Sequence, residues 1–230
     1  MPTFRGVRLV SNQDAVLRNG LLAEWLMNES GSTLTDTSGN GNDGAINGAT
    51  WYTLPSGYKV LSFDGNDYVE IGNPILPGDD ELTIMAFINP STDVIWAGPI
   101  FIETETVTGG QHTRNYLSQH RMTMTFDQFP PLGGSLNTPD FIAVGTWYHV
   151  AVVVKKPYRA IFVNGSVSVE DNSAETYLGY APSVTRIGYR GSASSHYYKG
   201  LIGPLRVYSR KLQPWEIQAL YNYDKALMGI

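Results

Sequence analysis

The 230-residue sequence contains no cysteine, which excludes disulfides, thiolate zinc sites and cysteine nucleophiles. It also lacks a basic stripe, since 16 Lys and Arg stand against 21 Asp and Glu, for a net charge of −5. A phosphate backbone is therefore not attracted electrostatically, and nucleic acid is not expected as a partner. No apolar run approaches the length of a membrane span, and residues 1–19 contain no apolar core of a signal peptide. We therefore expect neither membrane insertion nor export by an ordinary signal peptide.

Turn-forming residues are plentiful. Glycine (24 residues) and proline (13 residues) punctuate segments rich in Tyr, Val, Ile and Thr. They recur about every ten residues, the spacing of an antiparallel β-sandwich. Within residues 121–127, apolar Met122, Met124 and Phe126 alternate with polar residues, which predicts a strand with one buried face. Asn164-Gly165, between two apolar alternations, is typical of a two-residue hairpin turn. The sequence predicts an all-β, two-sheet antiparallel sandwich.

One short helix is expected near the C-terminus. In "LQPWEIQALY" (212–221), Pro214 suits the first helical position and Glu216 lies near the positive end of the helix dipole. Residues 1–19 lack strand periodicity and are interpreted as an arm that is disordered, wraps the domain or docks on a neighbour. The predicted organisation is an N-terminal arm (1–19), one β-domain (20–224) and a C-terminal tail (225–230).

Six segments become specific in combination. In chain order they are "GLLAEWLMNESGSTLTDTSGNGNDGAINGATW", "VLSFDGNDYVEIG", "LTIMAFINP", "TWYHVAVVVKKPYRAIFVNGSV", "TRIGY" and "GLIGPLRVYSRKLQPWEIQALY". Together they resemble the laminin-G-like jelly rolls of the concanavalin A-like lectin and glucanase superfamily. The resemblance implies a jelly roll of two curved antiparallel sheets, with a concave face that many relatives use for glycans.

The stretch "DTSGNGNDG" (36–44) is open to two interpretations. Its first half matches an EF-hand loop, but the twelfth position is Asn47, which supplies no bidentate carboxylate. The resemblance implies a structural calcium held partly by an acidic residue of a late strand, and Gly203-Pro204 stand where relatives commonly show Asp-Glu. The alternative is a metal-free corner with left-handed glycines and Asx-type turns. The candidate calcium ligands are Asp36, Ser38, Asn40 and Asn42.

No enzyme is expected from these residues. Glu103 and Glu105 share a strand face in "FIETETV", but the third acidic residue found in the superfamily's retaining glucanases does not follow. The sequence has neither an HExxH nor a GxSxG motif. His149, in "WYHVAV", resembles the family's "WHHVA" strand, which implies a histidine packed in the core.

Glycan binding would need exposed aromatic faces and a few hydrogen-bonding side chains. The resemblance implies core roles for Trp25, Trp51, Trp147, Trp215 and Tyr198. Other residues are predicted to lie on the concave strand face and its rim loops. The candidate carbohydrate-binding residues are Trp96, Arg114, Tyr116, Gln119, His120, Tyr177 and Tyr180.

Two functions remain open. "VLRNGLLAEWLMNE" and "EIQALYNYDKAL" resemble the leaders and tails of laminin-G-like proteins encoded among bacteriophage structural genes. They imply a virion structural, decoration or adhesion protein, assembled in the host cytoplasm with coat or tail subunits as a homo-oligomer, with weak binding of surface glycans. The alternative is an extracellular lectin, or a carbohydrate-binding module cut from a larger secreted protein. Deletion of residues 1–19 would distinguish the two.

Overall fold

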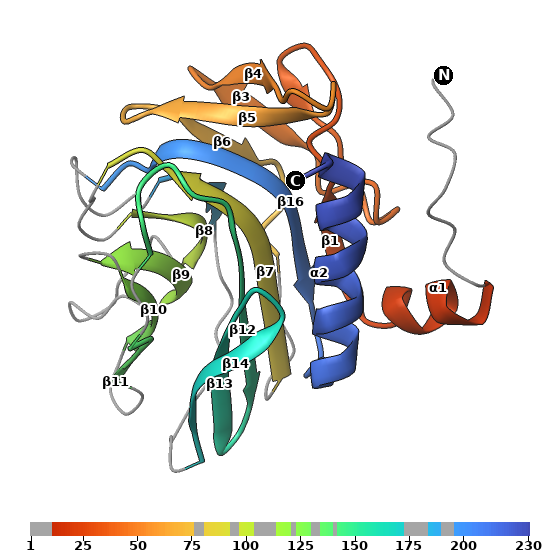
Figure 1. The fold of residues 1–230 in the computed structure, drawn as a ribbon, viewed down its shortest axis with the longest axis vertical. Coiled ribbons are helices and arrows are strands. Elements are labelled where there is room, and N and C mark those ends of the chain that lie inside the picture. Colours follow the sequence, from red (N-terminus) through yellow and green to blue (C-terminus); the bar gives the residue numbers. More distant parts are fainter. Residues whose placement is uncertain are drawn as a thin grey trace.

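The computed structural model describes residues 11–75, 81–92, 97–103, 114–120, 123–129, 134–139, 142–172, 184–189 and 196–230. Two eight-stranded antiparallel sheets pack face to face, with one long helix against the outside of one of them (Figure 1). This architecture confirms the predicted two-sheet sandwich with a C-terminal helix.

Sheet A has the strand order β14-β13-β12-β7-β16-β5-β4, with β1 beside β16. Its strands are β1 (Leu21–Trp25), β4 (Thr50–Thr53), β5 (Lys59–Asp64), β7 (Glu81–Pro90), β12 (Tyr148–Lys155), β13 (Tyr158–Val163), β14 (Ser166–Asp171) and β16 (Lys199–Tyr208). Sheet B has the order β11-β10-β9-β8-β15-β6-β3-β2. Its strands are β2 (Thr33–Leu34), β3 (Gly44–Asn47), β6 (Tyr68–Ile71), β8 (Ala97–Glu103), β9 (Arg114–His120), β10 (Thr123–Phe129), β11 (Gly134–Asn137) and β15 (Val184–Ile187).

The two sheets bury their strands differently. In β12, Val150, Val152 and Val154 pack into the core between the sheets. Ala151 and Val153 of the same strand are also fully buried, in a second cluster that includes residues of the C-terminal helix. In β6 of sheet B, by contrast, residues alternate between fully buried and partly exposed. Sheet A is therefore covered on both faces, which explains the continuous apolar run in β12.

The C-terminal helix α2 (Pro214–Met228) seals the outer face of sheet A. Pro214 occupies its first turn, and the Glu216 carboxylate accepts the backbone N–H of Gln213 at 2.7 Å. Ile217, Leu220 and Met228 are buried. The helix therefore continues into the predicted tail 225–230, and Met228 belongs to the packed part of the protein.

Trp215 corrects a prediction, since it is 52% exposed rather than part of the core. It lies two residues before the buried Ile217, which is about 200° around an α-helix. The side chain therefore points away from the buried face. Trp25 and Tyr198, at 0% and 1% exposure, do occupy the predicted core positions.

The predicted arm contains a helix, α1 (Ser11–Arg18). Leu17 is 4% exposed and packs in the cluster formed with α2. The Arg210 guanidinium donates to the carbonyl oxygens of Val16 (3.0 Å) and Asn19 (2.6 Å). Residues 1–19 were expected to be disordered, to wrap the domain or to dock on a neighbour. The described part, residues 11–19, packs against the chain's own domain.

The predicted hairpin at Asn164-Gly165 is confirmed. Both residues have positive φ, 51° and 81°, as a two-residue turn between β13 and β14 requires. Within the described residues, no helix is long and apolar enough to cross a membrane.

Candidate functional site

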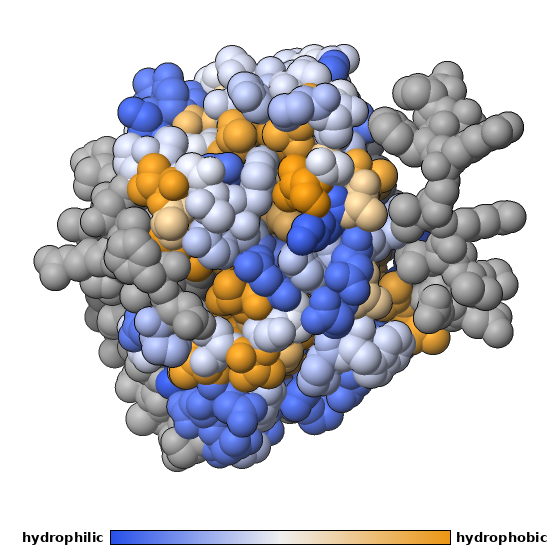
Figure 2. All heavy atoms as spheres, viewed as in Figure 1, coloured by the Kyte–Doolittle hydropathy of each residue, from blue (hydrophilic) through white to orange (hydrophobic). Residues whose placement is uncertain are grey.

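The outer faces of the two sheets differ in what covers them. Helix α2 lies against the outer face of sheet A (Figure 1), and Figure 2, in the same view, shows hydrophobic residues in separate patches between polar ones. Among the described residues no helix covers the outer face of sheet B. That open face is the candidate functional site.

Three tyrosines gather on this face. In β6, Val69 and Ile71 are buried in the core, so the alternate residues Tyr68 and Glu70 face outward. Tyr68 lies 5.6 Å from the ring of Tyr189, and Tyr189 is stacked on Tyr197 with ring centroids 4.1 Å apart and planes 9° apart. All three tyrosines are partly exposed. The cluster offers flat aromatic surface held by ring packing and by a β-bridge between Tyr189 and Tyr197.

An ion pair borders the tyrosines. Arg186 of β15 is the cross-strand partner of Glu70, and its Nε donates to Glu70 Oε2 at 2.8 Å. The guanidinium carbon also lies 5.7 Å from the centroid of the Tyr189 ring. The Glu70 side chain is 40% exposed and that of Arg186 12%. A carboxylate and a guanidinium are therefore presented beside the aromatic surface.

Strand register connects this cluster to the predicted glycan-binding residues. Directly paired residues on neighbouring strands share one face of a sheet. One such row runs, strand by strand, through Ala45, Glu70, Arg186, Phe101, Tyr116, Asp127 and Ser135. Ala45 and Ser135, at its two ends, are exposed, so the row lies on the outer face. Tyr116 therefore shares a row with Arg186.

The other predicted residues of β9 divide between the two alternate registers of the strand. Arg114 and His120 occupy the same register as Tyr116. Gln119 has the register of Leu117, which pairs with Phe126 of β10. Trp96, Tyr177 and Tyr180 lie outside the described residues.

The predicted carbohydrate-binding residues did not include the five that form this cluster, namely Tyr68, Glu70, Arg186, Tyr189 and Tyr197. A usable signal was present in "DYVEIG", where Tyr68 and Glu70 alternate with apolar residues. What the sequence alone did not supply was the strand order that places β6 beside β15.

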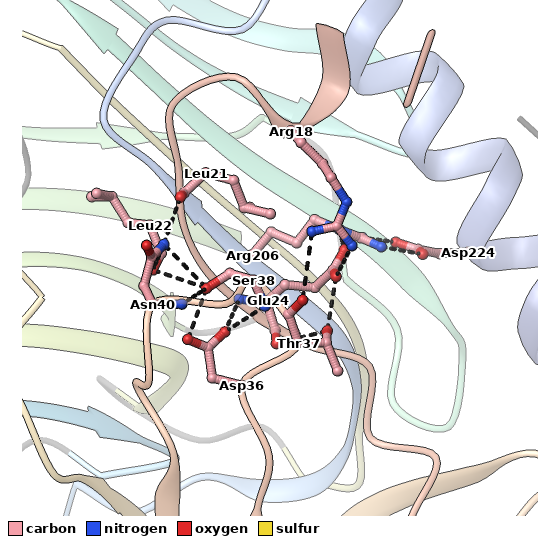
Figure 3. A network of polar contacts seen from close by, with 10 residues as sticks. All are labelled: Arg18, Leu21, Leu22, Glu24, Asp36, Thr37, Ser38, Asn40, Arg206 and Asp224. Carbon is pink, nitrogen blue, oxygen red and sulfur yellow. Dashed lines mark hydrogen bonds and ion pairs between the residues drawn. The ribbon is translucent and has the colours of Figure 1, made fainter. Parts of the chain in front are cut away.

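The corner at residues 36–44 is closed by its own hydrogen bonds (Figure 3). Asp36 Oδ1 accepts the backbone N–H groups of Glu24 and Ser38, at 3.0 and 2.9 Å. Asp36 Oδ2 accepts the Ser38 hydroxyl (2.7 Å) and the Asn42 backbone N–H (2.9 Å). These donors lower the pKa of Asp36 although burial, the largest influence on it, acts to raise it. Gly39 and Gly41, with φ of 94° and 76°, complete the turn.

The candidate calcium ligands do not fit a calcium site in this arrangement. Calcium binds through oxygen atoms. Here Asn40 and Asn42 turn their Nδ2 groups toward the Leu22 carbonyl oxygen, at 3.0 and 2.8 Å, and Ser38 Oγ lies 3.3 Å from it. Both Asp36 oxygens are also occupied by donors. In the described part of the chain, no three His, Cys, Asp or Glu residues converge as metal ligands.

The corner adjoins a buried ion network beneath α2 (Figure 3). Arg206 of β16 contacts Asp224 of α2 through both terminal nitrogens, one at 2.9 Å, and its Nε donates to Glu24 Oε1 at 2.8 Å. Burial raises the pKa of Asp224 despite Arg206. Burial also acts to raise the pKa of Glu24, but Arg206 and the Thr37 hydroxyl bring it below the usual value. Arg18 of α1 reaches the same Glu24 carboxylate at 3.4 Å.

His149, the histidine considered in the sequence analysis, has a structural role. His149 is 1% exposed and lies 5.1 Å from Phe87 and 5.6 Å from Tyr221, measured between ring centroids. The prediction of a packed core histidine is confirmed. Glu103 ends β8, and Glu105 lies outside the described residues.

Several solved structures share this fold at low sequence identity. Domain 4 of AbnA, an extracellular GH43 arabinanase of Geobacillus stearothermophilus solved in complex with arabinotriose, matches 87% of this chain and 98% of its own, with a TM-score of 0.66 and 16% identity. The binding domain of Paraclostridial Mosquitocidal Protein 1 matches 90% of this chain and 52% of its own, with a TM-score of 0.65 and 14% identity. A mutant Trypanosoma rangeli sialidase matches 91% of this chain, with a TM-score of 0.66 and 15% identity. This chain spans about half of the toxin domain and 33% of the sialidase.

No curated relative matches the chain at the level of sequence. The family model described as "Concanavalin A-like lectin/glucanases superfamily" matches residues 63–218. That range contains β7, β12, β16 and the cross-strand pair of Arg186 and Glu70. The chain belongs to the concanavalin A-like lectin/glucanases superfamily.

Proposed function

We propose that the chain is a non-catalytic carbohydrate-binding domain whose ligand lies on the outer face of sheet B. The observation that carries this proposal is the stacked pair Tyr189 and Tyr197, which lies beside the ion pair of Arg186 and Glu70. Aromatic faces stack on the apolar faces of sugar rings, while carboxylate and guanidinium groups bind hydroxyls. The site therefore combines the two kinds of contact that sugar recognition uses.

The similar structures support this class of ligand. One is a domain of an arabinanase in complex with arabinotriose, and another is the binding domain of a toxin. The proposed ligand is a surface oligosaccharide long enough to follow the outward row from Arg186 toward Tyr116. Repeated copies of the domain would raise the avidity of a weak single site.

A non-catalytic role is supported by the places of three of the described carboxyl groups with shifted pKa values. Glu24 and Asp224 are bound to Arg206 beneath α2, on the far side of sheet A. Asp36 is held by four donors in the corner. Each of these carboxylates serves packing or a turn, and none lies on the outer face of sheet B.

An array of immobilised neutral oligosaccharides, including arabinotriose, tests the proposal with the protein displayed on beads. Wild-type protein should bind a defined subset of glycans, and Arg186→Gln should lose that binding. Lys155→Gln is the matched control, because it removes a cross-strand ion pair with Glu81 on sheet A. A blank array, or equal binding by Arg186→Gln, would contradict the proposal.

The corner at residues 36–44 is proposed to be independent of metal, because protein donors already satisfy its oxygen atoms. It would then be a folding element that joins β1 to sheet B. Removal of calcium should leave both the corner and the glycan site intact.

Association with virion coat or tail subunits remains a prediction. Because α1 is docked on the domain, a test of this role must leave α1 in place. Deleting residues 1–19 would remove Leu17 and Arg18 from their contacts, whereas deleting residues 1–10 leaves α1 in place. Loss of particle association after the shorter deletion would support the virion role, and unchanged association would argue against a tether in that segment.

A further inference from the structure

A second aromatic surface lies on the other side of the molecule, against the C-terminal half of α2. A groove of about 290 Å³ opens there between β7, the turn before β14 and the helix. Its lining includes Phe87, Thr146, Trp147, Asn164, Tyr221 and Lys225. Because α2 covers the outer face of sheet A, this groove is separate from the tyrosines of sheet B.

The floor of the groove is a set of packed rings. Phe87 is 2% exposed and stacks on Tyr221, with centroids 5.9 Å apart and planes 15° apart. Trp147 meets Phe87 edge-on at 6.5 Å. Trp147 and Tyr221 are only partly buried, so part of each ring faces solvent. The floor is therefore a fixed apolar platform.

The rim supplies hydrogen-bond donors. Asn164 Oδ1 accepts the backbone N–H of His149 at 3.0 Å, which fixes the amide and leaves its Nδ2 group available. Among the described residues, neither that group nor the Trp147 indole N–H nor the Thr146 hydroxyl has a hydrogen-bond partner in the protein. A ligand rich in acceptor oxygens would complement this rim.

One charged side chain is among the lining residues. Lys225 Nζ lies 3.4 Å from the Tyr221 hydroxyl and 5.5 Å from the centroid of its ring. Beneath the floor, burial lowers the pKa of His149 to about 3, so this imidazole is neutral at neutral pH. The side chains of the groove thus carry a single positive charge, in a protein of net charge −5.

We propose that this groove binds a sugar ring that carries a carboxylate, such as a uronic acid residue of a glycan. One face of the ring stacks on Trp147, Tyr221 lines the side of the groove, and the carboxylate pairs with Lys225. The groove lies near the lower end of ligand-pocket volumes, about 300–1,000 Å³, which suits one ring rather than a long chain. Two sites on opposite faces would let one molecule bridge two glycans.

An NMR titration tests the proposal with methyl β-D-glucuronide and methyl β-D-glucoside, which differ only in the carboxylate. The readout is the indole N–H resonance of Trp147, assigned by Trp147→Phe. The glucuronide should shift this resonance saturably and bind about tenfold more tightly than the glucoside, as expected for one charge-assisted contact. Lys225→Gln should remove that preference, while the exposed control Lys156→Gln should keep it.

Two results would overturn the proposal. One is a Trp147 resonance that neither sugar moves, and the other is equal binding of both sugars with no effect of Lys225→Gln. The groove does not depend on the sheet B site, and the two can fail separately. Arg186→Gln should leave the Trp147 response unchanged, so a blank glycan array together with a Trp147 shift would contradict only the sheet B proposal.

Discussion

Two arginine–carboxylate clusters occupy the outer faces of the two sheets, and they differ mainly in burial. Arg206, paired with Glu24 and Asp224, lies under α2, with side-chain exposures of 2% for Arg206 and 1% for Asp224. Arg186, paired with Glu70, lies on the face that no described helix covers, with exposures of 12% and 40%. In both clusters a strand arginine meets a carboxylate of a neighbouring strand.

The two clusters contain the same residue types, so burial under α2 is what distinguishes the structural ion pair from the one proposed to bind a ligand. Arg206, Glu24 and Asp224 bind one another instead of water. Removing one of them would therefore leave a charged partner buried and unpaired. The side chains of Arg186 and Glu70 are partly exposed to solvent. In the proposed site, sugar hydroxyls would replace the water bound to them.

The largest expected effect is on stability at the buried cluster. Asp224→Asn should lower the free energy of unfolding by about 3–5 kcal/mol, because Arg206 loses a buried partner. Glu70→Gln should lower it by less than about 1 kcal/mol, since that pair is partly exposed. Urea denaturation of both variants measures the difference. Equal losses of unfolding free energy in the two variants would show that burial under α2 does not make the Arg206 cluster more important for stability than the Arg186 cluster.

A pH dependence should follow from His149, which is buried near Arg206. Its pKa is about 3 in the folded protein and about 6.5 when unfolded, so below pH 6.5 the unfolded state binds a proton that the folded state does not. Acidification should therefore lower the free energy of unfolding, by up to about 1.4 kcal/mol per pH unit between pH 6.5 and 3.

His149→Phe isolates this contribution from the other titrating groups. The raised pKa of Asp224 acts in the opposite direction, because it contributes stability at low pH that is lost as the pH rises. Between pH 6.5 and 5 the wild type should lose about 2 kcal/mol more than the variant in urea titrations. Parallel pH profiles would mean that His149 is protonated in the folded protein.

At the exposed cluster, the main effect should be on binding rather than on stability. Arg186→Gln should weaken binding of any glycan found on the array by about tenfold, the effect of losing one charge-assisted hydrogen bond. Its unfolding free energy should change by no more than about 1 kcal/mol. Calorimetric titration with that glycan measures the first effect. A destabilised variant with unchanged affinity would reverse the assignment of the two clusters.

The smallest effect is expected from chelation. EDTA should move the melting temperature by less than about 1 °C, because the corner at residues 36–44 is held by its own donors. A bound calcium at 100 times its Kd would add about 2.7 kcal/mol, a shift of several degrees. A drop in melting temperature with EDTA that calcium reverses would show that the corner holds a metal.

Local sequence predicted those features that local contacts determine. The Asn164-Gly165 turn and the histidine in "WYHVAV" were recognisable because turn chemistry and strand pattern act over a few residues. Trp215 was placed wrongly because its burial depends on which face of α2 meets the sheet. Helix α1 was missed because its docking depends on Arg210, which lies far away in the sequence.

The candidate site was predictable only in part, because it is assembled by strand order. Tyr116 was named from its surrounding residues, and the register places it in the outward row. Tyr68 and Tyr189 meet because β6 pairs with β15, a contact between segments more than 100 residues apart in the sequence. Gln119 was grouped with Tyr116, although the two residues occupy alternate registers of β9.

The most direct test of the central claim is an NMR titration of the full chain with the tightest-binding oligosaccharide from the array, followed through the side-chain resonances of Tyr68, Tyr189, Tyr197 and Arg186. Saturable shifts at these four residues, with the Arg206 and Asp224 resonances unchanged, are the predicted result. Saturable binding that leaves all four unchanged would contradict the claim that the outer face of sheet B is the glycan site.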